Sequence, residues 1–211
     1  MEGTSVTVAS VSEVGPDTVA LELETPEGFD ALPGQFVLLR AEPEDEVVSR
    51  HYTLSSSVDD TFELTVGIDP DGDLSPWLAD LEGGETVHIE GPFGTITYEG
   101  GDDIVAIAGG PGVGPAVAIA EAAEEAGHGA VVIYQDDEPA HVDRLEALED
   151  AGATVVFVDE DADDDLADAV ASHHEAGQAY AFGFDDFVTA VAEAIEDAGG
   201  DADQALIENF G

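Results

Sequence analysis

The spacing of hydrophobic residues changes near residue 100. From Thr4 to about Tyr98, apolar and polar residues alternate, as in the segment VALELE at residues 19–24. Alternation with a period of two is typical of strands that bury one face. It predicts six strands, at residues 4–14, 17–24, 34–41, 50–55, 61–67 and 85–91. These strands favour a small antiparallel barrel or sandwich.

One short helix is predicted to interrupt the strands. Ser75 is a favourable N-cap residue, and Pro76 would then occupy the first helical position. The helix would continue through Trp77 and Leu78.

Beyond the linker at residues 99–103, short apolar runs alternate with helical patterns. The predicted strands are residues 104–108, 130–134, 153–157, 179–182 and 204–208, and the predicted helices are residues 116–126, 139–150, 163–175 and 184–198. Strands that alternate with helices indicate a parallel sheet with helices on both faces. We therefore divide the chain into two domains, residues 1–99 and 100–211.

The charge of the chain is extreme. There are 50 acidic residues and three basic ones, Arg40, Arg50 and Arg144, so that the formal net charge is −47. A hydrophobic content of 44% is enough for a folded core, so we expect the acid on the surface of a globule. At about 1 M salt the Debye length is about 3 Å, which removes distant repulsion. The composition indicates a halophilic protein.

Composition also excludes several classes of function. Three scattered arginines cannot form the basic cluster that binding to nucleic acid or to an anionic membrane needs. The absence of cysteine excludes disulfides, thiolate chemistry and a cysteine-held iron-sulfur cluster within the chain. Residues 1–4 lack the pattern of a secretory signal, and the longest uncharged apolar stretch, residues 104–120, is too short for a membrane span. We expect a cytoplasmic protein.

Three segments carry candidate binding chemistry, and the first is the turn GGPGVGP at residues 109–115. Ligands of parallel sheets bind beyond the carboxyl ends of the strands. Glycine lets a phosphate approach the backbone N–H groups at the start of the following helix. A tight turn without any ligand would use the same residues, and the spacing differs from the dinucleotide fingerprint G-x-G-x-x-G.

The second candidate is the segment RHYTLSS at residues 50–56. The strand period places Arg50 and Tyr52 on one face and His51 and Thr53 on the other. An arginine beside aromatic and hydroxyl groups suits a ligand that has both a phosphate and an aromatic ring. An ordinary strand with one solvated arginine is the alternative interpretation.

The third candidate is the glycine turn at residues 72–75, which leads into the predicted short helix. Its backbone N–H groups would be able to bind phosphate, although a capped helix without a ligand would have the same sequence. No metal site is predicted. His173 and His174 lack suitably spaced partners, and Leu74 stands where a calcium loop that begins at Asp69 requires glycine. Residues 161–165 are interpreted as a solvated acidic loop.

In this order, the three segments resemble the ferredoxin-NADP reductase superfamily. The resemblance extends over nearly the whole chain and includes residues 33–36 (PGQF), 91–94 (GPFG) and 208–210 (ENF). It implies an N-terminal antiparallel six-stranded Greek-key β-barrel that binds a flavin. It also implies a C-terminal α/β domain with a parallel five-stranded nucleotide-binding sheet.

The resemblance implies roles for individual residues. Arg50 would bind the flavin phosphate, Tyr52 would lie against the isoalloxazine or ribityl group, and the Thr53 hydroxyl would lie near N5. The segment matched by residues 72–75 would cap the pyrophosphate, which favours FAD over FMN without excluding FMN. We predict the catalytic residues Thr53, Glu208 and Phe210, and the cofactor-binding residues Arg50, His51, Tyr52, Thr53, Gly72, Asp73, Leu74, Ser75, Gly110, Pro111, Gly112, Val113, Gly114 and Pro115.

In the family that the chain resembles, the turn matched by residues 110–115 receives the nicotinamide nucleotide. Hydride would pass from this nucleotide to the flavin, and electrons would leave for a separate acceptor protein such as a ferredoxin or an oxygenase component. The acidic segment at residues 135–138 (QDDE) would repel a 2′-phosphate, so NADH is favoured over NADPH. Arg144 is the nearby cation, and we expect it to pair with local carboxylates.

The sequence departs from the family mainly in the nucleotide half. Pro111 removes a backbone donor from the turn, and Phe182 and Phe184 stand where the family has the cysteine and proline of Cys-Gly-Pro. Two bulky aromatic residues there would block hydride donation. The leading hypothesis is an FAD-dependent NAD(P)H oxidoreductase, and the alternative is a flavin-binding electron-transfer or redox-sensing subunit that no longer uses a nicotinamide nucleotide. A third hypothesis, an interaction module without cofactor, conflicts with the retained residues at positions 50–53.

Overall fold

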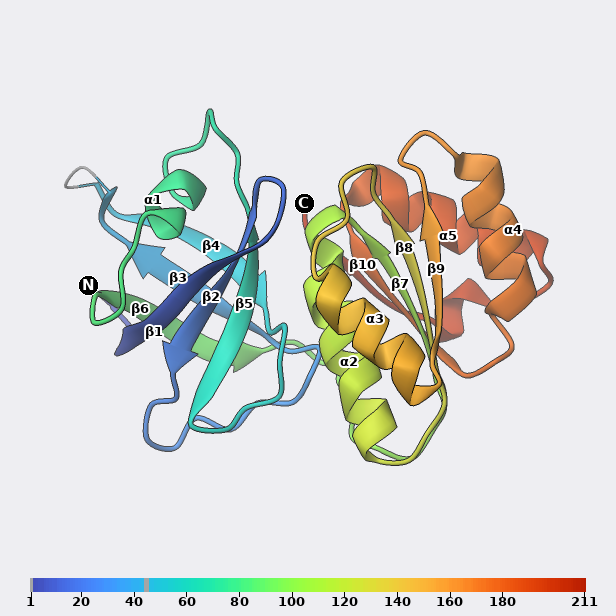
Figure 1. Ribbon diagram of the computed structural model, residues 1–211, viewed down its shortest axis with the longest axis horizontal. Helices are drawn as coiled ribbons and strands as arrows, with labels where there is room; N and C mark the ends of the chain where they lie inside the picture. Colours follow the sequence, from blue (N-terminus) through green and yellow to red (C-terminus); the bar gives the residue numbers. More distant parts are fainter. Residues whose placement is uncertain (1, 44–45) are drawn as a thin grey trace.

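The computed structural model describes residues 2–43 and 46–211 and contains two sheets that lie side by side (Figure 1). The first sheet contains β1 (Thr4–Gly15), β2 (Thr18–Glu24), β3 (Phe36–Ala41), β4 (Val48–Thr53), β5 (Thr61–Gly67) and β6 (Thr86–Phe93). Its strands are antiparallel in the order β4-β3-β6-β1-β2-β5. A bridge between Leu54 and Leu64 joins the two ends of this order and closes the barrel. The predicted six-stranded Greek-key barrel is confirmed.

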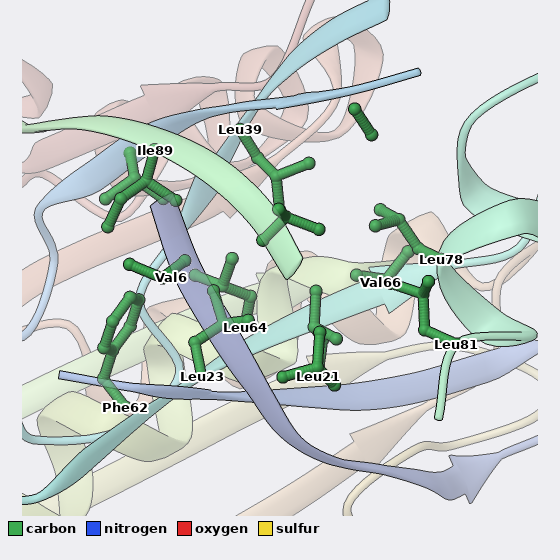
Figure 2. Close-up of a cluster of buried hydrophobic side chains, with 14 of the residues drawn as sticks. Val6, Leu21, Leu23, Leu39, Phe62, Leu64, Val66, Leu78, Leu81 and Ile89 are labelled. Atoms are coloured by element: carbon green, nitrogen blue, oxygen red, sulfur yellow. The ribbon is translucent and has the colours of Figure 1, made fainter. Parts of the chain in front are cut away.

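The interior of the barrel is an aliphatic core with one phenylalanine, Phe62 (Figure 2). Alternate residues of β2 and β5 point inward, and Leu21, Leu23 and Leu64 are fully buried. The helix α1 (Ser75–Ala79) adds Leu78, which is also fully buried. Each such side chain stabilises the fold by about 1.5–3 kcal/mol relative to an exposed one.

The start of α1 differs from the prediction by one residue. Leu74 is the N-cap, Ser75 is the first helical residue, and the Ser75 side chain makes no capping hydrogen bond. Its hydroxyl instead accepts a hydrogen bond from the backbone N–H of Asp69 at 3.0 Å. The Ser75 hydroxyl, which the sequence predicts as the cap of the helix, therefore stabilises the preceding loop.

The second sheet is parallel and contains β7 (Ile104–Gly109), β8 (Ala130–Gln135), β9 (Thr154–Val158), β10 (Gln178–Gly183) and β11 (Leu206–Asn209), in the order β11-β10-β7-β8-β9. The helices α2 (Val113–Glu125) and α3 (Val142–Ala151) pack on one face, and α4 (Asp163–His173) and α5 (Asp185–Asp197) pack on the other (Figure 1). Alternate residues of β7 pack against the helices on opposite faces of the sheet. Ile104 and Ala106 face α2, while Val105 and Ile107 face α5. The predicted five-stranded parallel sheet with helices on both faces is confirmed.

Some boundaries of elements differ from the predictions. The helix α2 begins at Val113, three residues before the predicted start, directly after the 3-10 turn η2 (Gly110–Gly112). The last strand starts at Leu206 because another 3-10 turn, η3 (Ala202–Gln204), occupies the predicted start. Residues 163–165 form the first turn of α4 and are not a loop, since acidic side chains there complement the helix dipole. The boundary between residues 99 and 100 falls in the connection from β6 to β7 and stays a prediction.

In the part of the chain that the structure describes, no helix is both long enough and apolar enough to cross a membrane.

Candidate functional site

A cleft with a volume of ≈ 950 Å³ opens where the barrel meets the parallel sheet. The barrel contributes β4 and loops that follow β1, β5 and β6, and the α/β half contributes the turn after β7, the loop after β8 and the end of β11. The C-terminus lies between the two halves in Figure 1. This volume is at the upper end of the range of about 300–1,000 Å³ that is common for small-molecule sites.

Strand β4 forms one wall of the cleft. The four residues of its RHYT segment, Arg50, His51, Tyr52 and Thr53, all line the cleft. The strand period places these residues alternately on two faces, but residues of both faces line the cleft. The physical reason is that β4 stands at one end of the strand order and pairs along its length only with β3, which leaves its other edge open to a ligand.

The side chains on β4 differ in exposure. Thr53 is 8% exposed, Tyr52 is half-buried, and Arg50 and His51 are exposed. Burial raises the pKa of Tyr52 to about 12, although the Arg50 charge lowers it in part, so the phenol keeps its proton and can donate a hydrogen bond. The ring of His51 packs edge-on against Phe36, with 5.2 Å between the ring centroids.

Arg50 differs from the two other arginines in its partners. Arg40 pairs with Glu90, and Arg144 pairs with two glutamates. The Arg50 guanidinium donates to the carbonyl of the adjacent Ser49 at 2.9 Å and makes no ion pair with any residue in the ranges 2–43 and 46–211. A guanidinium with donors to spare, at the wall of a cleft, fits a phosphate group.

The turn at residues 72–75 forms the wall beside β4, and all four residues line the cleft. Asp69 organises this turn, because its carbonyl accepts from Gly72 N at 3.0 Å and its carboxylate accepts from Asp71 N at 3.0 Å. Leu74 anchors the turn, since its side chain is 3% exposed and belongs to the barrel core. Gly72, Asp73 and Ser75 are therefore presented to the cleft on an anchored loop.

The glycine-rich turn after β7 contributes to the site less directly than predicted. Of residues 110–115, the two prolines line the cleft, whereas Gly110, Gly112, Val113 and Gly114 do not. A side chain at Gly112 would overlap the carbonyl group of Phe182, and one at Gly114 would overlap Thr65 in the barrel. Those two glycines are needed for packing between segments. Gly110 is different, because its φ is +54° and no atom lies within 4 Å of a methyl group placed there.

The end of β11 places an acid and an aromatic residue at the cleft. Glu208 pairs with Phe182 of β10, and the backbone N–H of Phe210 donates to the carbonyl of Gly183 at 2.9 Å. The buried Glu208 Oε2 has no hydrogen-bond partner in the described part of the chain. Burial raises the pKa of Glu208 to about 7, and the Thr53 side chain offsets part of this rise. The predicted residues Thr53, Glu208 and Phe210 all line the same cleft.

Comparison with known proteins agrees with this arrangement. Residues 5–98, which span the barrel, match the family described as "Oxidoreductase FAD-binding domain". The barrel is therefore similar to the FAD-binding domains of oxidoreductases. The match covers the barrel, including β4 and the turn at residues 72–75.

Curated relatives of this chain include the ferredoxin reductase component of 3-ketosteroid-9-alpha-monooxygenase from Mycolicibacterium smegmatis. It is 37% identical over 139 residues, which are 60% of this chain and 39% of the relative. The glycine betaine monooxygenase reductase subunit of Chromohalobacter salexigens is 39% identical over 104 residues, 46% of this chain and 28% of the relative. The chain thus spans less than half the length of either relative.

Solved structures with the same arrangement include the flavohem-like FAD/NAD binding domain of nitric oxide dioxygenase from Vibrio cholerae, with a TM-score of 0.83 and 24% identity over 100% of both chains. The ferredoxin reductase in carbazole 1,9a-dioxygenase has a TM-score of 0.83 and 25% identity, and the match covers 98% of this chain and 67% of that one. The two-domain fold is therefore shared in full.

The position of Phe182 in the structure corrects one expectation. Phe182 is fully buried and packs in the core between the sheet and α2, so it does not line the cleft. Phe184 does line it, is 53% exposed, and packs edge-on against Phe210 with ring centroids 6.0 Å apart. Of Phe182 and Phe184, only Phe184 therefore narrows the cleft.

Some residues that line the cleft were not predicted from the sequence. Asp17 and Thr18 follow β1, Thr65 belongs to β5, and Thr95 follows β6. Asp17 lies in the turn between β1 and β2 and has a φ of +46°. No local pattern distinguishes these residues from ordinary turn and strand residues, because they reach the cleft through the closure of the barrel.

Proposed function

We propose that this chain is a flavin-dependent oxidoreductase that passes electrons from NAD(P)H through bound FAD to a separate acceptor protein. The observation that carries this proposal is the meeting of three distant segments in one cleft: β4 with Arg50 and Thr53, the turn at residues 72–75, and the end of β11 with Glu208. Arg50 supplies a cation for phosphate, the turn at residues 72–75 supplies an anchored loop at the wall of the cleft, and Glu208 supplies a half-buried acid with a free oxygen.

The residues of the cleft fit FAD. Arg50, Tyr52 and the turn at residues 72–75 would hold the cofactor, and the buried Glu208 oxygen without a partner marks a place where a polar group is expected. Bound FAD would accept two electrons as a hydride and release them singly. Within the protein, Thr53 and Glu208 would hold a proton beside the cofactor, because the pKa of Glu208 near 7 keeps its carboxyl partly protonated at neutral pH.

The nucleotide half supports NADH as the donor. Asp136 and Glu138 line the cleft, and Asp136 is held in place because its carboxylate accepts from the Tyr134 hydroxyl at 3.0 Å and from Glu138 N at 2.8 Å. Arg144 does not offset these charges, since its guanidinium is bound to other carboxylates. A 2′-phosphate would therefore meet fixed negative charge.

The acceptor is proposed to be a ferredoxin or an oxygenase component, as the names of the reductase relatives suggest. The net charge of −47 supports a halophilic cytoplasm as the setting, where salt screens repulsion between an acidic reductase and an acceptor.

The deciding experiment is an absorbance spectrum of the protein purified in molar KCl and followed anaerobically near 450 nm on addition of NADH and then NADPH. A flavin band that NADH bleaches faster than NADPH is the expected result. A protein that stays colourless after reconstitution with FAD and FMN contradicts the proposal.

A second candidate is a flavin-binding electron-transfer or redox-sensing subunit that does not use a nucleotide. The exposed Phe184 beside Phe210 favours it, because this pair occupies the strand end nearest to Glu208. If a flavin band is present and neither nucleotide bleaches it, the variant Phe184→Ala should be compared. Bleaching gained in Phe184→Ala identifies this side chain as the obstacle.

A further inference from the structure

One arginine joins the two halves of the molecule. Arg144 lies on α3 and binds Glu121 of α2 through two nitrogens, Nε at 2.9 Å and Nη2 at 2.6 Å. Its Nη1 donates to Glu63 of β5 in the barrel at 2.8 Å, and its Nη2 also donates to the carbonyl of Ser55 at 2.8 Å. A single guanidinium therefore holds two segments of the barrel and two helices of the α/β half.

A second contact lies one helical turn away. The His141 Nε2 is 2.8 Å from the Thr65 hydroxyl, and the His141 backbone N–H donates to the carbonyl of Val14 at 2.8 Å. His141 is 3% exposed and has a φ of +54°, so the start of α3 adopts an uncommon backbone conformation where it meets the barrel. Gly114 at the start of α2 packs directly on Thr65 and Ser55.

The contacts of Arg144 lie outside the lining of the cleft, whereas the contact of His141 borders it. Arg144 does not line the cleft, but Ser55 stands two residues after Thr53 on the same segment. Thr65, the partner of His141, does line it, and so does Pro115, which follows Gly114. The helix that carries Glu121 begins at the glycine-rich turn. A shift of α2 relative to β4 would therefore change the distance between the two walls of the cleft.

The two carboxylates of the cluster need a positive charge between them. Burial raises the pKa of Glu63, and the Arg144 charge lowers it in part. Burial alone would lower the pKa of Arg144, but the hydrogen bonds and charges of Glu121 and Glu63 raise it above its ordinary value. Without the guanidinium, two carboxylates from different halves would face one another in a partly buried space. Buried pairs of this kind are screened by salt much less than exposed ones, so the contact persists in molar salt.

We propose that Arg144 is a positioning residue that sets the nucleotide-binding half against the flavin-binding half at the separation needed for hydride transfer. This inference rests on the proposed function. Arg144 touches neither wall of the cleft, so its contribution is to geometry and not to binding. Displacement of reacting groups by about 1 Å is enough to slow a reaction by about 100-fold.

The experiment compares Arg144→Gln, Arg144→Lys and the control Arg40→Gln in holoenzyme prepared in molar KCl. The control removes one positive charge as well, but the pair of Arg40 with Glu90 lies within the barrel. The readouts are FAD affinity and the limiting rate of flavin reduction at saturating NADH. Arg144→Gln should reduce that rate by about 100-fold with FAD affinity within about twofold of the wild type. Arg144→Lys should recover part of the rate, and Arg40→Gln should retain it.

Two results overturn the proposal: a wild-type reduction rate in Arg144→Gln, or an equal loss of rate in Arg40→Gln. If Arg144→Gln does not fold, Glu63→Ala replaces it, because this change removes the barrel partner and keeps the Arg144 pair with Glu121. Glu63→Ala should then slow flavin reduction by about 10-fold, and an unchanged rate contradicts the proposal.

Small-angle X-ray scattering of the protein without nucleotide separates failure of this inference from failure of the proposed function. If no nucleotide reduces the wild-type flavin, the proposed function fails. In that case, the scattering curves alone test whether Arg144 holds the two halves together. A larger radius of gyration in Arg144→Gln than in Arg40→Gln supports Arg144 as the residue that holds the two halves together, and identical curves overturn it.

Discussion

The barrel and the α/β half form the cleft in different ways. The barrel uses side chains, and the four residues 50–53 of β4 all reach the cleft. The glycine-rich turn of the α/β half contributes less, since of residues 110–115 only Pro111 and Pro115 reach the cleft. A side-chain motif on an edge strand can therefore be recognised from sequence. In a glycine-rich turn, only the packing of the folded protein shows which glycines face a ligand and which pack against the protein.

The largest expected effect comes from a comparison within that turn. Gly112→Ala should destabilise the protein by about 3 kcal/mol, because the new methyl group overlaps the Phe182 carbonyl although φ is an ordinary −61°. Gly110→Ala should cost only about 1 kcal/mol, since it has a positive φ but free space. Chemical denaturation in molar salt measures both. An equal loss of unfolding free energy in both variants would contradict this distinction between the two glycines.

The next effect is on flavin binding by the barrel. Arg50→Ala should weaken FAD binding by about 10- to 100-fold, because charge-assisted hydrogen bonds to phosphate contribute about 1.5–3 kcal/mol. Arg40→Ala is the matched control, since its guanidinium pairs with Glu90. Fluorescence titration with FAD measures the affinity. If both variants bind FAD as well as the wild type, the phosphate site lies elsewhere.

Glu208 provides a prediction on pH. Burial raises its pKa from the ordinary 4.5 to about 7 in the folded protein. The unfolded chain therefore releases this proton first, and the residue lowers stability progressively as the pH rises from about 4.5 to about 7. Glu208→Gln should remove this loss, so the variant gains melting temperature relative to the wild type between pH 5 and pH 8. Glu138→Gln, which changes another acid of the cleft, is the comparison, and a gain of equal size there contradicts the assignment.

The smallest expected effect is on the choice of nucleotide. The double variant Asp136→Asn/Glu138→Gln should raise the kcat/KM ratio of NADPH to NADH by about two- to fivefold, because exposed charges near a phosphate contribute up to about 1 kcal/mol. Asp137→Asn is the control, since Asp137 does not line the cleft and its carboxylate accepts from Glu160 N at 2.8 Å. Steady-state kinetics at two salt concentrations measure the ratio, and an increase of equal size in the control would rule out a local effect.

Much of the fold and part of the site follow from local pattern. The change of hydrophobic period near residue 100 separated the barrel from the parallel sheet, because side-chain spacing responds directly to which faces are buried. The predictions that were wrong concern the direction in which a side chain points. Phe182 and Phe184 look equivalent in sequence, but β10 ends at Gly183 and Phe184 is the N-cap residue of α5, so Phe182 lies in the core and Phe184 lines the cleft. The Ser75 hydroxyl likewise serves Asp69 and not the helix, a choice that depends on how the loop closes.

The sequence by itself determined the two kinds of sheet, the order of the elements and the segments from which the cleft is made, because periodicity and turn residues act within a few positions. Only the tertiary structure decided which glycines pack on the protein, that Glu208 lies buried near Thr53, and that Arg144 joins Glu63 to Glu121. Those outcomes depend on contacts between residues up to 155 positions apart, as from Thr53 to Glu208. Such contacts exist only once the barrel and the sheet have packed together.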